Sequence, residues 1–149
     1  MQLQYTVLCN TKAWLGEEEP WGDSPFYATS EPPISFDAYV ERICTFAKPS
    51  FEHAVLASEI MRKLCETQAF GTRSLHRLCI ACVTLATKWL EDGYDALHKD
   101  AYMAKVGGIS LSELATLQYA ALVLLDWNLY AVAAALDEEL TALRDYQIC

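Results

Sequence analysis

The chain contains the stretch SLHRLCIACVTLATKWLED at residues 74–92, and this stretch decides the fold. Ser74 opens a predicted helix that reaches Glu91 or Asp92. Apolar side chains occupy almost every side of this helix and leave hardly any polar face for water. A helix of this kind has to be surrounded by other helices, so we predict that it lies at the centre of the domain.

Helical patterns fill the rest of the chain from residue 35 onward. The predicted helices span approximately residues 35–48, 50–71, 74–92, 98–106, 111–125 and 136–146. Ser110-Leu111-Ser112-Glu113 is typical of a capping box at a helix start, while Gly107-Gly108 ends the preceding helix. No strand-like alternation or hairpin turn competes with this pattern. We therefore predict an all-α fold.

Composition and charge narrow the range of functions. A chain of 149 residues fits one ordinary domain, and 53% hydrophobic residues exclude a wholly disordered chain. The net charge of -9 makes nucleic acid a poor partner, because the chain repels phosphate. No apolar run reaches the ~18–20 residues of a membrane helix, and the start lacks the features of a signal peptide. We expect a soluble intracellular protein, nuclear or cytoplasmic, that binds neither nucleic acid nor a membrane.

The first 32 residues form an acidic, Pro-rich segment that differs from the rest. Its composition permits two interpretations, a labile, degradation-prone tail or an arm docked on the domain. The apolar side chains in it are too numerous for a freely solvated tail: Trp14, Leu15, Trp21, Phe26 and Tyr27. The docked arm is therefore the favoured interpretation.

The cysteines and histidines raise the question of a metal site. His76, Cys79 and Cys82 recur at a spacing of three, which places them along one side of a single helix. Zinc prefers four convergent ligands, usually with cysteine pairs across a turn. We therefore predict that these cysteines are core residues in a reducing compartment, and we expect no metal site and no cofactor.

Two helices, at residues 74–92 and 111–125, are apolar on more sides than a domain this small can bury. The surplus predicts an exposed apolar surface, and such surfaces usually mark an interface. Two polar residues are embedded in these helices, Lys88 and Gln118. From the residues alone, Lys88 is predicted to extend its ammonium group to water near Asp92, one turn further on.

Several stretches resemble one known family. They are AYMAKVGGISLSEL at residues 101–114, LLDWNL at 124–129, YVERI at 39–43, SLHRL at 74–78 and ATKWLED at 86–92. The chain resembles the P-type cyclins, which are single-box cyclins. The resemblance implies a five-helix cyclin box over residues 33–130, between the N-terminal arm at 1–32 and a C-terminal helix at 131–149. It further implies a regulatory subunit that is not an enzyme, has no catalytic residue, and binds and activates a cyclin-dependent protein kinase.

The resemblance also implies which residues would contact the kinase. They are Lys88, Trp89, Gln118, Tyr119, Leu122 and Trp127. In the family the lysine is normally paired with a glutamate of the fifth helix, and this position is Gln118 here. We therefore expect a weaker orientation of Lys88, for which Glu91, Asp92 or Asp126 could compensate. A second departure is Met61, where many cyclins carry an aspartate that anchors the N-terminal helix.

The helix-one motif that forms the substrate-docking groove of cell-cycle cyclins is absent from residues 36–46. Substrate recruitment through such a groove is therefore not expected. Gln118 and Met61 keep an alternative function open, that of a cyclin-fold scaffold binding a protein other than a kinase. An enzyme is disfavoured, because no histidine stands beside a nucleophile and no phosphate-binding glycine loop is present.

Overall fold

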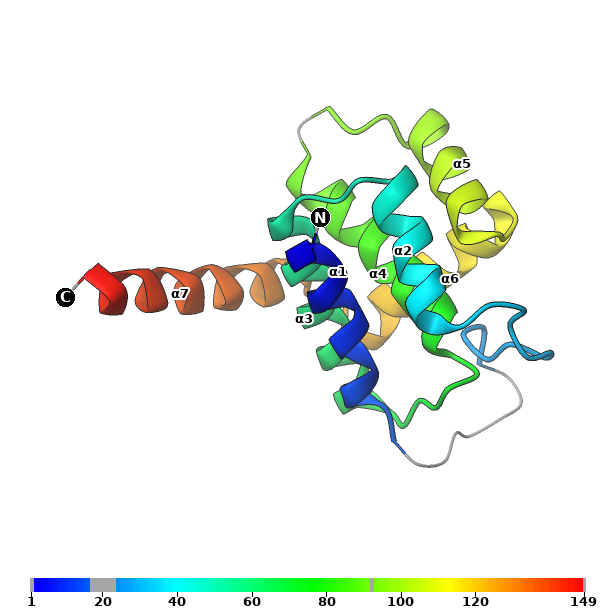
Figure 1. Ribbon diagram of the computed structural model, residues 1–149, viewed down its shortest axis with the longest axis horizontal. Coiled ribbons are helices and arrows are strands. Elements are labelled where there is room, and N and C mark those ends of the chain that lie inside the picture. Colours follow the sequence, from blue (N-terminus) through cyan, green and yellow to red (C-terminus); the bar gives the residue numbers. More distant parts are fainter. Residues whose placement is uncertain (1, 17–23, 92, 149) are drawn as a thin grey trace.

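The computed structural model describes residues 2–16, 24–91 and 93–148, and every regular element in these residues is helical (Figure 1). The elements in chain order are α1 (Gln2–Cys9), the 3₁₀ helix η1 (Asn10–Trp14), α2 (Phe36–Phe46), α3 (Phe51–Thr67), α4 (Leu75–Leu90), α5 (Ala96–Gly107), α6 (Leu111–Leu124) and α7 (Leu129–Ile148). The predicted all-α class is confirmed, and α2 to α6 supply the five helices in the predicted order.

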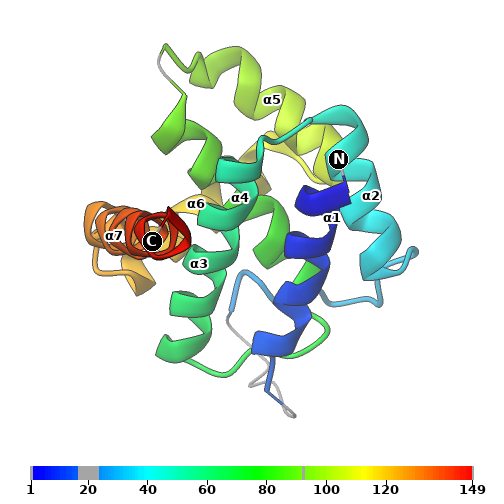
Figure 2. The same ribbon diagram turned by 60° about the vertical axis from the view of Figure 1, so that its left-hand side comes forward.

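The central position of α4 is confirmed. Nine consecutive residues, Leu78 through Ala86, are buried together with Leu75, and Thr84 is the one polar side chain among these ten residues. The helix packs against α2, α3, α5 and α6, as the two ribbon views show (Figures 1 and 2). Since hydrophobic residues cover its whole circumference, only a surrounded position removes them from water.

Serine side chains cap the N-termini of three helices around α4, namely α2, α3 and α6. The Ser110 hydroxyl accepts a hydrogen bond from the Glu113 backbone N–H at 3.0 Å, and the Glu113 carboxylate accepts one from the Ser110 N–H at 3.3 Å. This reciprocal pair confirms the predicted capping box. A nearby guanidinium, that of Arg77 at 3.0 Å, lowers the pKa of the Glu113 carboxyl, and the Ser110 N–H adds to this effect.

The Lys-Val-Gly-Gly-Ile run at residues 105–109 brings the end of α5 into close contact with α2 and α4. We call this run the packing joint. The Tyr39 hydroxyl donates to the Gly107 carbonyl at 2.7 Å, and the Arg42 guanidinium donates to the Val106 carbonyl at 2.6 Å. A Cβ at Gly107 would lie 2.6 Å from Ile80 Cγ1, so only glycine allows this approach. Gly108 follows with a φ of +69° and ends the helix. The run therefore fixes the angle at which α5 meets the core.

The start of the N-terminal segment is helical, a feature that was not predicted from the sequence. Its first residues form α1 and η1, which pack against α2 and α3 (Figure 2). Buried Leu8 and Cys9 explain the helix, because they place an apolar face against the core. Further along, the Phe26 ring packs edge-on against Phe70 at 5.6 Å, and Arg77 donates to the Pro25 carbonyl at 3.0 Å. Trp21 lies outside the described residues.

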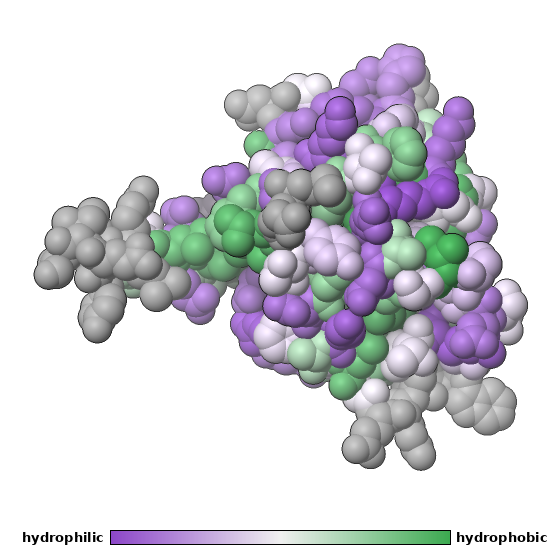
Figure 3. Space-filling model, in the orientation of Figure 1, coloured by the Kyte–Doolittle hydropathy of each residue, from purple (hydrophilic) through white to green (hydrophobic). Residues whose placement is uncertain are grey.

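The last helix is longer than predicted. It begins at Leu129 instead of near residue 136, because the Asn128 side chain accepts from the Ala131 N–H at 3.3 Å and caps it there. Buried Leu129 and Val132 attach its first turns to the domain, and the rest of α7 projects away from the other helices (Figure 1). Hydrophobic residues, drawn in green, are exposed on the part of α7 that lies next to the rest of the domain (Figure 3).

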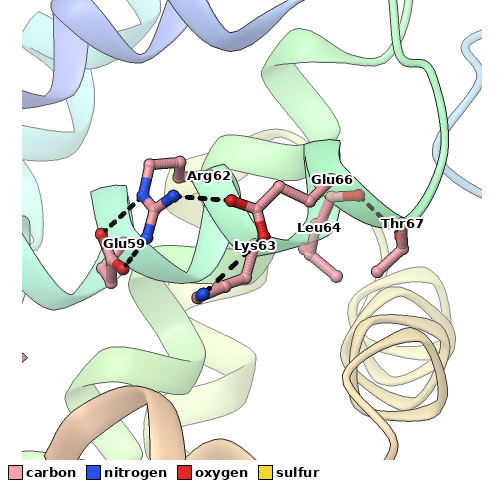
Figure 4. A network of polar contacts seen from close by, with 6 residues as sticks. All are labelled: Glu59, Arg62, Lys63, Leu64, Glu66 and Thr67. Atoms are coloured by element: carbon pink, nitrogen blue, oxygen red, sulfur yellow. Dashed lines mark hydrogen bonds and ion pairs between the residues drawn. The ribbon is translucent and has the colours of Figure 1, made fainter. Parts of the chain in front are cut away.

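A polar network on α3 faces the base of α7. Arg62 donates to Glu59 at 3.0 Å and to Glu66 at 2.6 Å, and Lys63 lies 3.7 Å from the same Glu66 (Figure 4). Hydrogen bonding to Glu59 raises the pKa of Arg62, and the charge of Glu139 on α7 adds to this effect. Negative charge on α7 therefore lies near the Arg62 guanidinium of α3.

Among the described residues no single helix is long and apolar enough to cross a membrane, and one pair of helices passes the same criteria only jointly, with a 96° bend between His98–Gly107 and Leu111–Leu124. The same part of the chain contains no group of three or more His, Cys, Asp or Glu arranged to hold a metal ion.

Candidate functional site

The turn between α6 and α7 holds two consecutive residues in a left-handed backbone conformation. Asp126 has a φ of 55° and Trp127 a φ of 59°. Such a conformation costs roughly 1–2 kcal/mol for each L-residue with a side chain. The Trp127 N–H donates to the Leu122 carbonyl at 2.8 Å and the Asp126 N–H to the Val123 carbonyl at 3.0 Å, which holds the turn in place. Strain of this kind is typical of sites where a side chain must point in one direction.

The turn places aromatic rings at the surface. Trp127 packs edge-on against Tyr119, with 5.5 Å between ring centroids, although the two residues remain 58% and 62% exposed. Trp89, which is 42% exposed, packs against Tyr130 at 6.2 Å. Since Trp127 and Tyr130 are three residues apart, both pairs flank the same turn. We call Trp89, Tyr119, Trp127 and Tyr130 the aromatic face.

A charged cluster lies at the C-terminal end of α4, beside Trp89 in the chain. The Lys88 ammonium donates to Asp100 Oδ2 at 2.6 Å, and the Tyr94 hydroxyl donates to Asp100 Oδ1 at 2.6 Å. The Gln118 side-chain nitrogen lies 3.4 Å from the same Oδ2. Asp100 and Gln118 are buried, at 9% and 6% exposed, whereas Lys88 is partly exposed. Lys88 is therefore the partly exposed member of a polar cluster whose other members, Asp100 and Gln118, are buried.

Tyr94 is held in its neutral form. Burial raises the pKa of its hydroxyl most, and its hydrogen bond to the Asp100 carboxylate raises it further. Its ring also lies below two ammonium groups, 5.7 Å from Lys88 Nζ and 5.4 Å from Lys99 Nζ. Tyr94 thus remains a hydrogen-bond donor to Asp100 at neutral pH.

The partner of Lys88 is not one of the residues named from the sequence. Glu91 pairs with Lys99 at 2.7 Å, Asp126 lies exposed in the α6–α7 turn, and Asp92 lies outside the described residues. Asp100 takes the role instead, with its Oδ2 at 2.6 Å from the Lys88 ammonium. A signal was present in the sequence: Asp100 lies three and four residues before the buried Met103 and Ala104, on the buried side of α5. An acid on that side has to find a partner.

The structure brings together most of the residues that the resemblance implied. Lys88 and Gln118 meet through Asp100, Tyr119 meets Trp127, and Trp89 stands at the surface. Gln118 is buried, so it can affect a partner only through its neighbours. Leu122 is partly buried against the core, and its carbonyl is engaged by the turn. Three residues of this arrangement were not predicted from the sequence: Asp100, Tyr94 and Tyr130.

A shallow groove continues the aromatic face along α7. Its volume is about 370 Å³. It is lined by Leu56, Trp89, Leu90, Tyr130, Ala133, Ala134, Leu136 and Leu140, with the carboxylates of Glu52 and Asp137. The exposed aromatic rings therefore adjoin further apolar surface rather than standing alone.

Comparison with known proteins assigns this arrangement to a family. The cyclin family profile matches residues 15–129. Cyclin-U4-1 of Arabidopsis thaliana is 36% identical over 94 residues, which cover 61% of this chain and 45% of that protein. From Oryza sativa subsp. japonica, Cyclin-P4-1 is 35% identical over 100 residues, 65% of this chain and 46% of that protein. Cyclin-P3-1 of the same plant is 36% identical over 106 residues, 70% of this chain and 44% of that protein.

The chain spans about half the length of the curated relatives it matches. The family match extends from the end of η1 to the start of α7 and so includes the packing joint, the Lys88 cluster and nearly all of the aromatic face. On this evidence the chain belongs to the cyclin family and is a P-type cyclin.

Proposed function

We propose that this P-type cyclin binds a cyclin-dependent protein kinase through the aromatic face and Lys88, and that it activates the kinase as its regulatory subunit. The observation that carries the proposal is the aromatic face itself. Four large rings are exposed on both sides of a strained turn, and Trp89 directly follows Lys88, whose ammonium group is bonded to Asp100. Exposed apolar surface of this kind is typical of a protein interface.

The chemistry of activation needs no catalytic group from the cyclin. An active kinase requires its C-helix to stand close enough for a Lys–Glu pair to hold the ATP phosphates. A rigid helical surface that binds only this arrangement raises its population. Lys88 is suited to bind the C-terminal end of the kinase C-helix, because its ammonium group can donate hydrogen bonds to the free carbonyl groups there.

The size of the aromatic face fits this role. Burying one large apolar side chain contributes about 1.5–3 kcal/mol. Trp89, Tyr119 and Trp127 are each roughly half exposed, so together they offer roughly 2–4 kcal/mol on contact. Shifting a kinase from almost wholly inactive to almost wholly active takes about 5.5 kcal/mol of differential binding. The aromatic face can therefore supply a large part of the shift, and Lys88 and the groove can contribute to the rest.

Affinity purification from cells that express the tagged chain tests the proposal. We expect a cyclin-dependent kinase among the bound proteins, with phosphorylation of a peptide substrate in the eluate. The double variant Tyr119→Ala/Trp127→Ala should lose both the kinase and the activity. Leu111→Ala serves as the control, because it removes an exposed apolar side chain at the other end of α6.

Recovery of partners without any kinase would contradict the proposal and favour the scaffold alternative. Since a kinase partner acts inside the cell, we also propose an intracellular location. Fluorescence microscopy of the tagged chain, with its kinase, would test this location.

A further inference from the structure

We infer that Asp100 is the positioning residue of this interface: it holds the Lys88 ammonium in the orientation that a partner meets. This inference rests on the proposed function, since it concerns the same surface. Asp100 itself is buried and cannot contact a partner directly. Its effect on binding has to pass through Lys88.

Three donors converge on the Asp100 carboxylate. Oδ1 accepts from the Tyr94 hydroxyl at 2.6 Å, while Oδ2 accepts from Lys88 Nζ at 2.6 Å and lies 3.4 Å from Gln118 Nε2. The donors come from α4, α6 and the segment before α5, so the carboxylate can turn in no direction without breaking a contact. Hydrogen bonds that involve an ionised group are the stronger kind, and burial keeps competing water away.

The geometry explains why such a support matters for Lys88. A lysine side chain has four rotatable bonds and loses much rotational freedom when it is fixed. In this protein the Lys88 side chain loses that rotational freedom when the chain folds, before a partner binds. A preorganised donor binds its acceptor more tightly than a mobile one, because the entropy of ordering is no longer subtracted from binding.

Gln118 offers a way to test the role of charge separately from shape. Its Nε2 and the Lys88 ammonium reach the same oxygen of Asp100, so the two groups are neighbours. The other polar atom of this side chain, Oε1, is buried without a hydrogen-bond partner among the described residues. A carboxylate at position 118 would therefore stand close enough to replace that of Asp100. The negative charge can be moved from α5 to α6 with two isosteric substitutions.

The experiment compares wild type, Asp100→Asn and Asp100→Asn/Gln118→Glu. The control is Asp37→Asn, which removes the carboxylate from the exposed pair that Asp37 forms with Lys12 at 3.3 Å. Two quantities are measured for each protein. The first is the ¹H–¹⁵N NMR signal of the Lys88 ammonium in the free protein, assigned with Lys88→Arg. The second is Kd for the purified cyclin-dependent kinase that binds wild type most tightly in a panel.

We expect a resolved ammonium signal in wild type, its loss in Asp100→Asn and its return in the double variant. Kd should rise at least tenfold in Asp100→Asn, return to within threefold of wild type in the double variant, and change less than twofold in Asp37→Asn. The ammonium signal separates the two roles, because it reports on the Lys88 side chain in the folded protein, whereas a residue needed only for folding would leave that signal unchanged in the folded fraction. Unchanged binding by Asp100→Asn, or a double variant no better than the single one, would overturn the inference.

The two proposals can fail separately. If no kinase in the panel binds wild type, the proposed function fails, and the positioning role is decided by the NMR signal alone. Persistence of this signal in Asp100→Asn would then overturn it. If Asp100→Asn does not fold, the wild-type spectrum decides, since a lysine that exchanges freely with water and gives no ammonium signal cannot be held by Asp100.

Discussion

The packing joint at Gly107 leads to a quantitative prediction for Gly107→Ala. The new methyl group would lie 2.6 Å from Ile80 Cγ1 and 3.0 Å from the Tyr39 hydroxyl oxygen. Ile80 is fully buried, so it cannot move aside at low cost. Overpacking of this kind costs about 1–3 kcal/mol. Displacing the Tyr39 hydroxyl from the Gly107 carbonyl adds about 1 kcal/mol, and the better helix propensity of alanine returns up to about 1 kcal/mol.

The net loss should be about 1–3 kcal/mol in the free energy of unfolding. At this chain length 1 kcal/mol lowers Tm by about 2–4 °C, so we expect a decrease of roughly 2–12 °C by circular dichroism. Urea unfolding should give the same energy. The control Gly108→Ala has no atom within 4 Å of its Cβ, so its cost reflects only the φ of +69°.

A double-mutant cycle with Ile80→Ala separates the clash from other effects. Ile80→Ala removes Cγ1, so Gly107→Ala should cost at least 1 kcal/mol less in that background. Additive energies, or a Gly107→Ala variant as stable as wild type, would refute the close approach of α5 to α4.

Three further predictions concern stability. Lys88→Met should lower the free energy of unfolding by about 2 kcal/mol in chemical denaturation, because it leaves the buried Asp100 carboxylate unpaired, and Lys88→Met/Asp100→Asn should recover most of this loss. Burial raises the pKa of Tyr39 and Cys79 above their ordinary values of 10.0 and 9.0, so the unfolded chain releases these protons first as pH rises. Tm should be nearly constant between about pH 7 and 8.5 and fall from pH 9 to 11, whereas a constant Tm from pH 9 to 11 would contradict the burial of both groups. Asn128→Ala should cost about 1 kcal/mol by removing the cap of α7, measured as a Tm lower by about 2–4 °C, while an unchanged Tm would argue against this helix start.

The elements predicted well are those set by local chemistry. The helix around residues 74–92 could be placed at the centre because its composition allows no other position. The Ser110–Glu113 box could be read directly, since both partners lie within one turn. In such cases the decisive contacts lie within a few residues of each other.

The features that were not predicted depend on contacts between residues far apart in the chain, and the sequence alone does not show which of these residues lie close together. Asp100 pairs with Lys88, which lies twelve residues earlier in the chain. From the sequence, several other acidic residues were equally plausible partners of Lys88. The start of α7 was misplaced because Asp137 and its acidic neighbours favoured a helix start there, while the true cap at Asn128 follows two left-handed residues that are not glycine. Backbone strain at Trp127 has no signature in composition, because the surrounding fold imposes it.

Reconstitution of kinase activity with purified components tests directly whether the aromatic face binds and activates a kinase. A cyclin-dependent kinase is assayed alone, with the wild-type chain, with Tyr119→Ala/Trp127→Ala and with Leu111→Ala. We expect strong activation by wild type and Leu111→Ala and at least a tenfold loss for the double aromatic variant at equal concentration. Equal activation by the double aromatic variant, with its fold intact, would contradict the assignment of this surface to the kinase.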